Sequence, residues 1–381
     1  WKRRHNMKFV HIGDLHLGKV IHQYSLLDIQ RELLFELLTY MDEQDIRLLV
    51  IAGDVYDRLI PSQEAVNLLD DFLSQALLTY HIQVLMISGN HDSRDRLHFA
   101  SSILSENGLH IETYLKENMA FVEYGKTRFY LLPFVKPSQV KMLYPDQDMH
   151  DYQSALSFYL SKQSLDHDYQ NILVTHQFVG HSSVTSESEV PLSVGGSEII
   201  DASLFDNFDY VALGHLHAPQ KVKRETMRYS GSLMCYSFDE VNQKKSIVIV
   251  DTDDLSITTH ELHPRQTLKK YQGTFAQFMQ NDFIEKKDDF LAFELLDETI
   301  VPHAIEQLRV LYPHLLQITY QYLMKHNQTS SFQPIQSIQQ MDTLSLFEQF
   351  YQDVKSQKLN DLQKDVVRTL LEKAGEESEN Y

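Results

Sequence analysis

Residues 8–16 read Lys-Phe-Val-His-Ile-Gly-Asp-Leu-His, an apolar run that ends in a glycine, a carboxylate and an imidazole. The same order recurs at 48–54, where Leu-Leu-Val-Ile is followed by Ala-Gly-Asp, and at 84–92, where Val-Leu-Met-Ile is followed by Ser-Gly-Asn-His-Asp. A short apolar run that stops at a glycine predicts a buried strand. Open sheets present their functional side chains at the carboxyl ends of strands, so the sequence predicts an α/β fold with a polar site at these ends.

Apolar residues at helical spacing separate these strands. One helix is expected from Leu26 to Leu38, and another after Pro61-Ser62 with Val66, Leu69, Phe72 and Leu73 on one face. Further strands are expected at 121–124 and 128–132, paired across Gly125-Lys126, and at 171–175, 210–213, 246–251 and 255–260. The pattern therefore predicts an α/β sandwich over residues 7–267.

The pattern changes after residue 267. Residues 274–280 and 305–311 look helical and residues 290–296 and 315–322 extended, which predicts a small α+β domain over 268–326. Residues 327–340 are rich in Asn, Gln and Ser and are expected to form a linker. A helical element of two amphipathic helices is expected over 341–374. One helix has an apolar stripe of Leu344, Phe347, Tyr351 and Val354, and one face of the other is traced by Leu359, Leu362, Val366, Leu370 and Lys373.

Charge and composition narrow the functional classes. The 381 residues carry 34 basic and 53 acidic side chains, a formal charge of −19. A protein that held nucleic acid alone through a broad basic face would not have this balance. Two divalent ions would add positive charge at one spot and a partner could supply the rest of the binding surface, whereas most of the acidic side chains can instead serve solubility. No apolar run reaches the length of a membrane span. With Cys235 as the single cysteine, the expected location is the cytoplasm.

Five predicted strand ends carry the candidate metal ligands. Each motif alone is a weak signal, because Gly-Asp and Gly-Asn are also common turn residues. Together they offer a mixture of imidazole, carboxylate and amide groups, which suits Mn(II), Fe(II) or Zn(II) better than Mg(II) or Ca(II). Seven candidates exceed the needs of one ion, and a carboxylate such as Asp54 can bridge two. The candidates are Asp14, His16, Asp54, Asn90, His176, His215 and His217.

These motifs, in this order, resemble the calcineurin-like metallophosphoesterases. Residues 16–19, 229–232 and 236–238, with the small domain and the terminal helices, extend the resemblance to the SbcD family of bacterial nuclease subunits over 7–373. The resemblance implies a sandwich of two mixed β-sheets flanked by helices, with a small α+β capping domain and a C-terminal helical hairpin. It also implies two divalent metal ions, with Mn(II) expected, and hydrolysis of phosphodiester bonds in DNA.

The resemblance implies a role for each site residue. Asp14, His16 and His217 would hold the first metal, and Asn90, His176 and His215 the second, with Asp54 bridging both. His91 would act beside the scissile phosphate as a general acid or a stabiliser of developing charge, and Asp92 would orient it. Leu15 occupies a position where related chains often have an aromatic residue, and the role of Asp57 is left open.

Substrate and partner contacts are expected outside the ligand set. Lys19, Arg94 and Arg96 would either meet DNA phosphates or balance the acidic site. The resemblance implies that the C-terminal helices bind SbcC, an SMC-like ATPase, through Leu344, Phe347, Tyr351, Leu362 and Val366. Alternatively, the two helices could pack against each other as a hairpin that closes the fold. It also implies a homodimer through the helices after Pro61 and after Arg94. Alternatively, the apolar faces of these helices could be buried entirely in the core of the same chain.

The resemblance implies exonuclease action on duplex ends and endonuclease action on hairpins and single strands, in DNA repair and recombination. The alternative is a stand-alone metallophosphatase or cyclic-nucleotide phosphodiesterase, which would not need the C-terminal domains. A non-catalytic adaptor is a third reading, and it would be expected to lack a ligand or His91, yet every one of these positions is filled.

Overall fold

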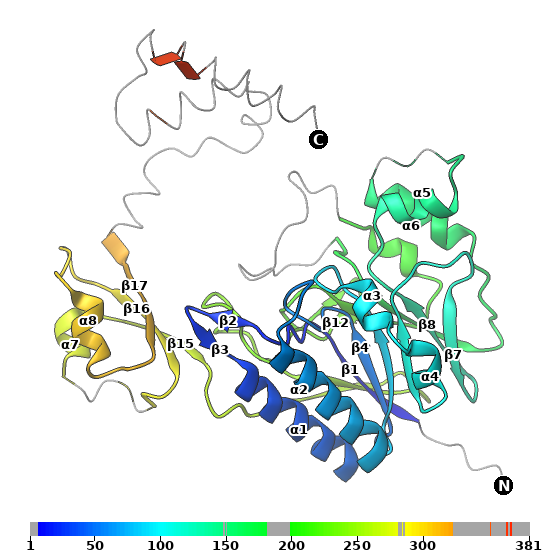
Figure 1. Ribbon diagram of the computed structural model, residues 1–381, viewed down its shortest axis with the longest axis horizontal. Coiled ribbons are helices and arrows are strands. Elements are labelled where there is room, and N and C mark those ends of the chain that lie inside the picture. The colour runs from blue at the N-terminus through cyan, green and yellow to red at the C-terminus, as the bar shows by residue number, and fades with distance from the viewer. Residues whose placement is uncertain are drawn as a thin grey trace. The chain divides into compact units, whose positions relative to one another are not determined.

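A computed structural model describes residues 7–147, 149, 151–180, 199–280, 284, 286–322, 351, 363–364 and 366–367 (Figure 1). The chain divides into two compact units, one of residues 1–295 with 301–319 and one of residues 296–300 with 320–381. The first unit contains both large sheets and all the predicted ligands. The predicted linker at 327–340 lies outside the described residues. In the described part of the chain, no helix is long and apolar enough to cross a membrane.

The first large sheet has six strands in the order β14-β13-β1-β4-β5-β6. Its parallel strands are β1 (Lys8–Ile12), β4 (Leu48–Ala52), β5 (Gln83–Ile87) and β6 (Leu109–Glu112). β13 (Ile247–Asp251) runs antiparallel to β1, and β14 (Ile257–His260) runs antiparallel to β13. Every residue of β4 is buried, as expected for a strand that is covered on both faces.

The second large sheet has the order β11-β12-β10-β9-β8-β7. Its parallel strands are β8 (Thr127–Leu132), β9 (Gln170–His176), β10 (Tyr210–Gly214) and β12 (Arg224–Tyr229). β7 (Ala120–Tyr124) forms the predicted hairpin with β8, and β11 (Gln220–Val222) runs antiparallel to β12. Both sheets are therefore mixed, and the predicted sandwich is confirmed.

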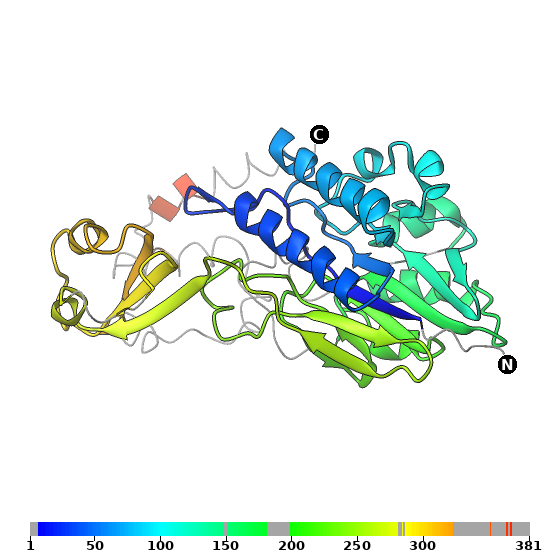
Figure 2. The same cartoon turned by 90° about the horizontal axis from the view of Figure 1, so that it is seen from below.

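Apolar side chains fill the space between the sheets and cover their outer faces. Phe9 of β1 meets Phe129 of β8 edge to face, with ring centroids 5.1 Å apart. Helices α1 (Leu27–Glu43) and α2 (Gln63–Ser74) lie side by side over the first sheet, and α2 continues into η1 (Gln75–Thr79) (Figures 1 and 2). Helix α6 (Tyr152–Ser161) and η2 (Ala202–Phe205) pack on the second sheet. The shorter elements are α3 (Arg94–His98), α4 (Ser101–Ser105), α5 (Pro137–Leu143), β2 (Val20–Ile21) and β3 (Tyr24–Ser25).

A small three-stranded sheet follows, in the order β15-β16-β17. Its strands are β15 (Leu268–Gly273), β16 (Phe290–Leu295) and β17 (Leu315–Tyr320), and its helices are α7 (Phe275–Phe278) and α8 (Ala304–Arg309). Phe278 stacks on Phe293 at 4.0 Å, and the Tyr24 ring, next to α1, lies 5.5 Å from Phe290. These aromatic contacts give the small sheet its own core and join it to the start of the large sandwich.

One prediction about the helix faces was wrong. Val66 was expected on the buried face of the second helix, but its side chain is 42% exposed. The buried stripe of α2 consists of Ala65, Leu68, Leu69 and Phe72, which follow the i, i+3, i+4, i+7 spacing. Leu69 and Phe72 lie on the buried face as predicted, but in the first turn the buried residue is the small Ala65 rather than Val66.

Gly214, at the end of β10 in the second sheet, lies close to Ala52, at the end of β4 in the first. A Cβ atom at Gly214 would collide with the Ala52 carbonyl oxygen and lie 2.7 Å from His176 Nδ1. We expect Gly214→Ala to lower the free energy of unfolding by about 1–3 kcal/mol, because the sheets must separate to accommodate the methyl group. Urea denaturation followed by circular dichroism measures this change.

Gly13→Ala is the matched control for this prediction. A Cβ atom at Gly13 would have its nearest neighbours at 3.5 Å, an ordinary van der Waals distance, and one of those neighbours is Gly214 itself. Its denaturation midpoint should stay close to that of the wild type. Equal midpoints for the two variants would show that the sheets are not held this closely at Gly214.

Candidate metal centre

The predicted ligands converge at one edge of the sandwich. Asp14 and His16 follow β1, Asp54 follows β4, and Asn90 follows β5 in the first sheet. His176 ends β9, and His215 and His217 follow β10 in the second sheet. The carboxyl ends of parallel strands lie at the same sheet edge, so two sheets packed face to face bring both sets together. Among the described residues, three groups of His and Asp have donor atoms within 4.8 Å of one another.

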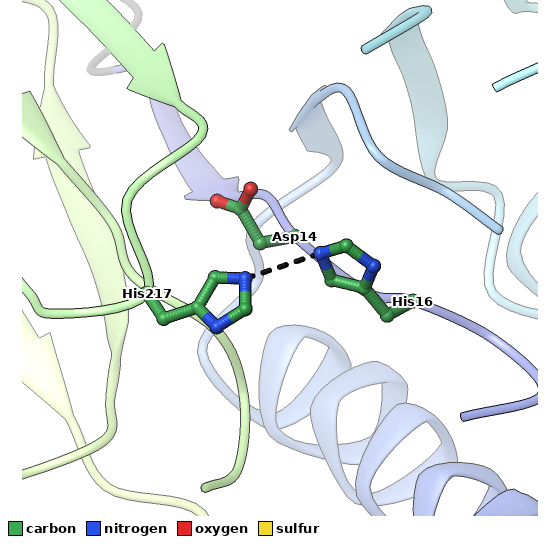
Figure 3. A group of neighbouring side chains, drawn as sticks. All are labelled: Asp14, His16 and His217. Carbon is green, nitrogen blue, oxygen red and sulfur yellow. Dashed lines mark hydrogen bonds between the residues drawn. The ribbon is translucent and has the colours of Figure 1, made fainter. Parts of the chain in front are cut away.

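The first group is Asp14, His16 and His217, each no more than 1% exposed (Figure 3). The Nε2 atoms of the two imidazoles lie 3.1 Å apart, and the Asp14 carboxylate lies beside them. The main-chain N–H of His215 donates to Asp14 Oδ1 at 2.9 Å, which fixes this carboxylate. Three donor atoms within 4.8 Å of one another can be held by a single metal ion.

A second set lies on the other side of Asp54. The Asn90 Oδ1 atom is 2.9 Å from His176 Nε2 and 3.1 Å from His215 Nδ1. One amide oxygen and two imidazole nitrogens therefore meet in a second small region. His176 also belongs with Asp14 and Asp54 to one of the three donor groups.

Asp54 lies between the two sets. Its Oδ2 atom is 3.3 Å from His176 Nε2 and 3.7 Å from His16 Nε2. Its other oxygen, Oδ1, accepts the main-chain N–H of His91 at 2.8 Å. This hydrogen bond orients the carboxylate, so that one oxygen faces an imidazole from each set.

The ligand loops adopt an uncommon backbone conformation. Four residues of the set, Asp14, His16, Asp54 and His215, have positive φ values of 53°, 43°, 49° and 110°. Left-handed backbone costs on the order of 1–3 kcal/mol at a residue with a side chain, and such residues concentrate at functional sites. The tight turns aim the side chains across the sheet edge, which an extended chain would not do.

The donor chemistry at His176 fits a cation. Its Nδ1 lies 2.8 Å from the Ala52 carbonyl oxygen, which can only accept, so the N–H is on Nδ1 in the neutral ring. Nε2 then offers a lone pair toward the Asn90 and Asp54 oxygens, which are acceptors as well. Burial opposes a charged imidazole, but the Asp54 carboxylate outweighs it and raises the pKa of His176 to about 9. These groups thus attract positive charge to Nε2, and a metal ion supplies it.

The other three imidazoles of the ligand set are neutral at pH 7. Burial lowers the pKa of His215 to about 3 and that of His217 to about 4, and it also lowers the pKa of His16. The neutral ring is the form that binds metal, so these three side chains need to lose no proton first. Burial alone would raise the pKa of Asp54, but the surrounding histidines hold it well below its usual range, and the carboxylate is ionised.

His91 and Asp92 lie beside this cluster, but Asp92 is placed differently from our expectation. Its carboxylate, expected to orient the His91 ring, accepts main-chain N–H groups from Val55, Tyr56 and Gly89 at 2.9–3.0 Å. The His91 ring instead has its Nδ1 3.1 Å from the Asp57 carbonyl oxygen. Burial and the nearby Asp54 raise the pKa of Asp92 to about 6. Asp92 therefore joins the loops after β4 and β5, and a carbonyl orients His91.

Lys19, Arg94 and Arg96, the three residues expected to bind phosphate, differ in their surroundings. Lys19 Nζ pairs with Asp57 Oδ1 at 2.9 Å, close to the metal ligands. Arg94 and Arg96 are exposed on α3, and the Arg94 guanidinium lies over the Tyr114 ring, 5.7 Å from its centroid. The structure thus places Lys19 where it balances acidic charge and leaves the two arginines on the surface.

Two buried polar residues that support the site were not predicted. The Gln30 side chain, on the buried face of α1, donates to the carbonyls of Leu15 and His16 at 3.0 and 2.9 Å and accepts from Gly18 N at 3.1 Å. A glutamine on an otherwise apolar helix face was a signal available in the sequence. Glu240, whose oxygen lies 3.2 Å from His217 Nδ1, follows β12 in a loop without any periodic pattern.

A sandwich of two mixed sheets that gathers Asp, Asn and His donors around one shared carboxylate defines a metal-dependent phosphoesterase. Residues 7–219 match the calcineurin-like phosphoesterase family, and residues 264–355 match the type 5 capsule protein repressor C-terminal domain. The SbcD subunit of the nuclease SbcCD from Staphylococcus epidermidis is 33% identical over 371 residues, which is 96% of this chain and 98% of that protein. The chain therefore belongs to the calcineurin-like phosphoesterases and, within them, to the SbcD family.

Solved structures also match, at low sequence identity. The TT1561 protein of Thermus thermophilus is 11% identical, with a TM-score of 0.39, over 68% of this chain and 100% of that chain. A dimetal phosphatase from Danio rerio is 12% identical, with a TM-score of 0.35, over 66% of this chain and 98% of that chain.

Proposed function

We propose that this chain is the nuclease subunit of an SbcCD-type complex and cuts DNA phosphodiester bonds with two divalent metal ions, of which Mn(II) is the expected native metal. The observation that carries the proposal is the position of Asp54 Oδ2, between an imidazole of each ligand set. The relative that is 33% identical along nearly the whole chain is itself a nuclease subunit, which supports DNA as the substrate. The activities would be exonuclease action on duplex ends and endonuclease action on hairpins and single strands.

The residues divide the work as follows. Asp14, His16 and His217 would hold one ion and Asn90, His176 and His215 the other, with Asp54 shared. When bound, the ions supply positive charge that stabilises the phosphoryl oxygens during an in-line displacement. The protein contributes placement, because the buried carboxylates and imidazoles are already oriented by main-chain groups before substrate arrives.

His91 is the candidate for proton transfer or charge stabilisation at the scissile phosphate. Its ring is half-buried, whereas the ligand imidazoles are buried, so it borders the side from which substrate enters. If Nδ1 donates to the Asp57 carbonyl, Nε2 is the atom that faces the substrate. Asp92 would act through the loops that it joins, as a positioning residue. Arg94 and Arg96 would meet DNA phosphates, which would position DNA without reading its sequence.

Metal-dependent cleavage assays test this proposal. Purified chain is incubated with Mn(II) and a linear duplex or a DNA hairpin, with and without SbcC and ATP, and EDTA serves as the metal-free control. Cleavage of both DNA substrates that EDTA abolishes is the expected result. If the DNA stays intact under all these conditions while a small phosphodiester is hydrolysed, the stand-alone phosphodiesterase is the correct assignment.

We further propose that the helical element at 341–374 binds the SbcC-type ATPase. Tyr351 and Val366 are described as helical, and Val366 is 55% exposed, whereas Leu344, Phe347 and Leu362 lie outside the described residues. Exposed apolar side chains on a helix are typical of an element that docks into a partner groove. The −19 charge of the chain also favours a partner that supplies part of the DNA-binding surface.

Truncation after residue 330 is expected to abolish co-purification with SbcC. The truncated chain keeps both large sheets and the whole ligand set, so it should retain hydrolysis of a small phosphodiester at about the wild-type rate. Pull-down of tagged SbcC by the full-length and truncated chains measures the first effect. Undiminished capture by the truncated chain would show that the terminal element closes the fold instead.

A homodimer through α2, α3 and α4 is also proposed. Large apolar side chains are exposed on and next to these helices: Ile60, Val66, Phe99 and Ile103 are 73%, 42%, 81% and 71% exposed. This exposure favours a partner surface over the alternative in which these faces pack only against the core of the same chain.

The single cysteine, Cys235, is buried and free, which fits the proposed cytoplasmic location.

A further inference from the structure

Glu240 is a buried carboxylate whose contacts converge on one metal ligand. It is fully buried and lies in the loop between β12 and β13. Its Oε1 atom is 3.2 Å from His217 Nδ1 and accepts the Ser237 hydroxyl at 3.0 Å, and its Oε2 atom accepts the Tyr236 main-chain N–H at 3.3 Å. A buried carboxylate is costly unless each oxygen has such partners.

Lys245 supplies the opposite charge and reaches the same histidine. Its Nζ atom donates to Glu240 Oε2 at 2.6 Å, to the His217 carbonyl at 2.8 Å and to Ser232 Oγ at 2.9 Å. Its side chain is 9% exposed. Glu240 and Lys245 therefore contact His217 at two points: Lys245 binds its main-chain carbonyl, and Glu240 faces its ring.

The position of Glu240 determines which ring nitrogen of His217 carries the proton. A carboxylate can only accept, so the N–H of His217 is on Nδ1 and Nε2 keeps a lone pair. That lone pair faces His16 Nε2 at 3.1 Å. His16 Nδ1 lies 3.6 Å from Asp57 Oδ1, beyond hydrogen-bond distance, and that oxygen pairs with Lys19 Nζ at 2.9 Å. The Nε2 lone pair of His217 is therefore directed into the donor group that this residue forms with Asp14 and His16.

We propose that Glu240, held by Lys245, is a positioning residue that fixes the His217 ring and its tautomer for the metal ion held with Asp14 and His16. This inference rests on the proposed metal site and assigns a function to two residues outside it. Carboxylates behind metal-binding histidines increase the basicity of the ring and its metal affinity, and their loss typically costs about 10–100-fold in affinity. His176, by contrast, is backed by the Ala52 carbonyl, so the effect should be confined to one of the two ions.

Mn(II) binding to the full-length chain tests the proposal, with free Mn(II) followed by its EPR signal. Glu240→Gln preserves size and removes the charge, and we expect the affinity for one ion to fall by about 10–100-fold while that for the other changes little. Glu240→Asp keeps the charge beside Lys245 but shortens the reach to His217, so its affinity should lie between those of Glu240→Gln and the wild type. It serves as the second variant if Glu240→Gln does not fold.

Asp289→Asn is the matched control for a purely structural effect. Asp289 is also a buried carboxylate paired with a lysine: it lies 3.3 Å from Lys286 Nζ and accepts Thr267 N at 2.9 Å, but it directly precedes β16 of the small sheet. Its variant should bind Mn(II) as the wild type does, even if it is less stable. Wild-type affinity in both folded Glu240 variants, or an equal loss in Asp289→Asn, would overturn the proposal. A wild-type chain that binds no Mn(II) would instead refute the metal site itself.

Discussion

Replacing Asp54 with asparagine should reduce Mn(II)-dependent DNA cleavage by about 10³-fold, the scale of losing a preorganised electrostatic group in an active site. The change is nearly isosteric. Asparagine can still accept the His91 main-chain N–H through Oδ1, a contact of 2.8 Å in the structure. What disappears is the negative charge of Oδ2, which lies 3.3 Å from His176 Nε2 and 3.7 Å from His16 Nε2.

Metal binding should fall together with the rate, because Asp54 is shared by both ligand sets. Initial cleavage rates on a linear duplex and the number of Mn(II) ions bound per chain measure the two effects. Asp71→Asn is the control, since Asp71 is an exposed carboxylate on α2 that pairs with Arg31 at 2.9 Å, and its variant should keep both properties. Cleavage at the wild-type rate by metal-loaded Asp54→Asn would show that the bridging assignment is wrong.

The sequence predicted the ligand cluster because two independent patterns coincide at each strand end. An apolar run such as 48–51 predicts a buried strand, and the polar residue after it must then lie at the sheet edge. The structure gives β4 as Leu48–Ala52 and places Asp54 two residues later. No knowledge of side-chain contacts was needed, since strand direction alone brings the ligands of one sheet together.

Contacts between distant loops could not be predicted in this way. Asp92 was assigned to its sequence neighbour His91, whereas its carboxylate binds main-chain N–H groups of Val55 and Tyr56, more than thirty positions earlier. Glu240 and Lys245 lie in a loop with no periodicity, so nothing in their spacing indicates His217. Strand β15 was missed as well, because only its first and last residues, Leu268 and Gly273, are buried.

His91→Ala should separate chemistry from metal binding. We expect cleavage of both a linear duplex and a DNA hairpin to fall by about 10²–10⁴-fold, the usual contribution of a positioned acid or base. Two Mn(II) ions should still bind, because Asp14, His16, Asp54, Asn90, His176, His215 and His217 are unchanged. The Asp54 orientation should also survive, since the bond to its Oδ1 comes from the main chain of residue 91 and alanine retains it.

The number of metal ions bound by the variant decides whether His91 acts in the chemistry or is itself a metal ligand. The His91 ring lies 4.9 Å from that of His16 and forms one of the three donor groups with His16 and Asp54. A variant that loses activity but keeps both ions assigns His91 to proton transfer or charge stabilisation, whereas loss of one ion assigns it to the ligand set. His263→Ala is the control, because the His263 side chain is 77% exposed and contacts Glu36 of α1, outside the ligand set. An His91→Ala variant as active as this control would remove His91 from the mechanism and leave the reaction to the ligand set alone.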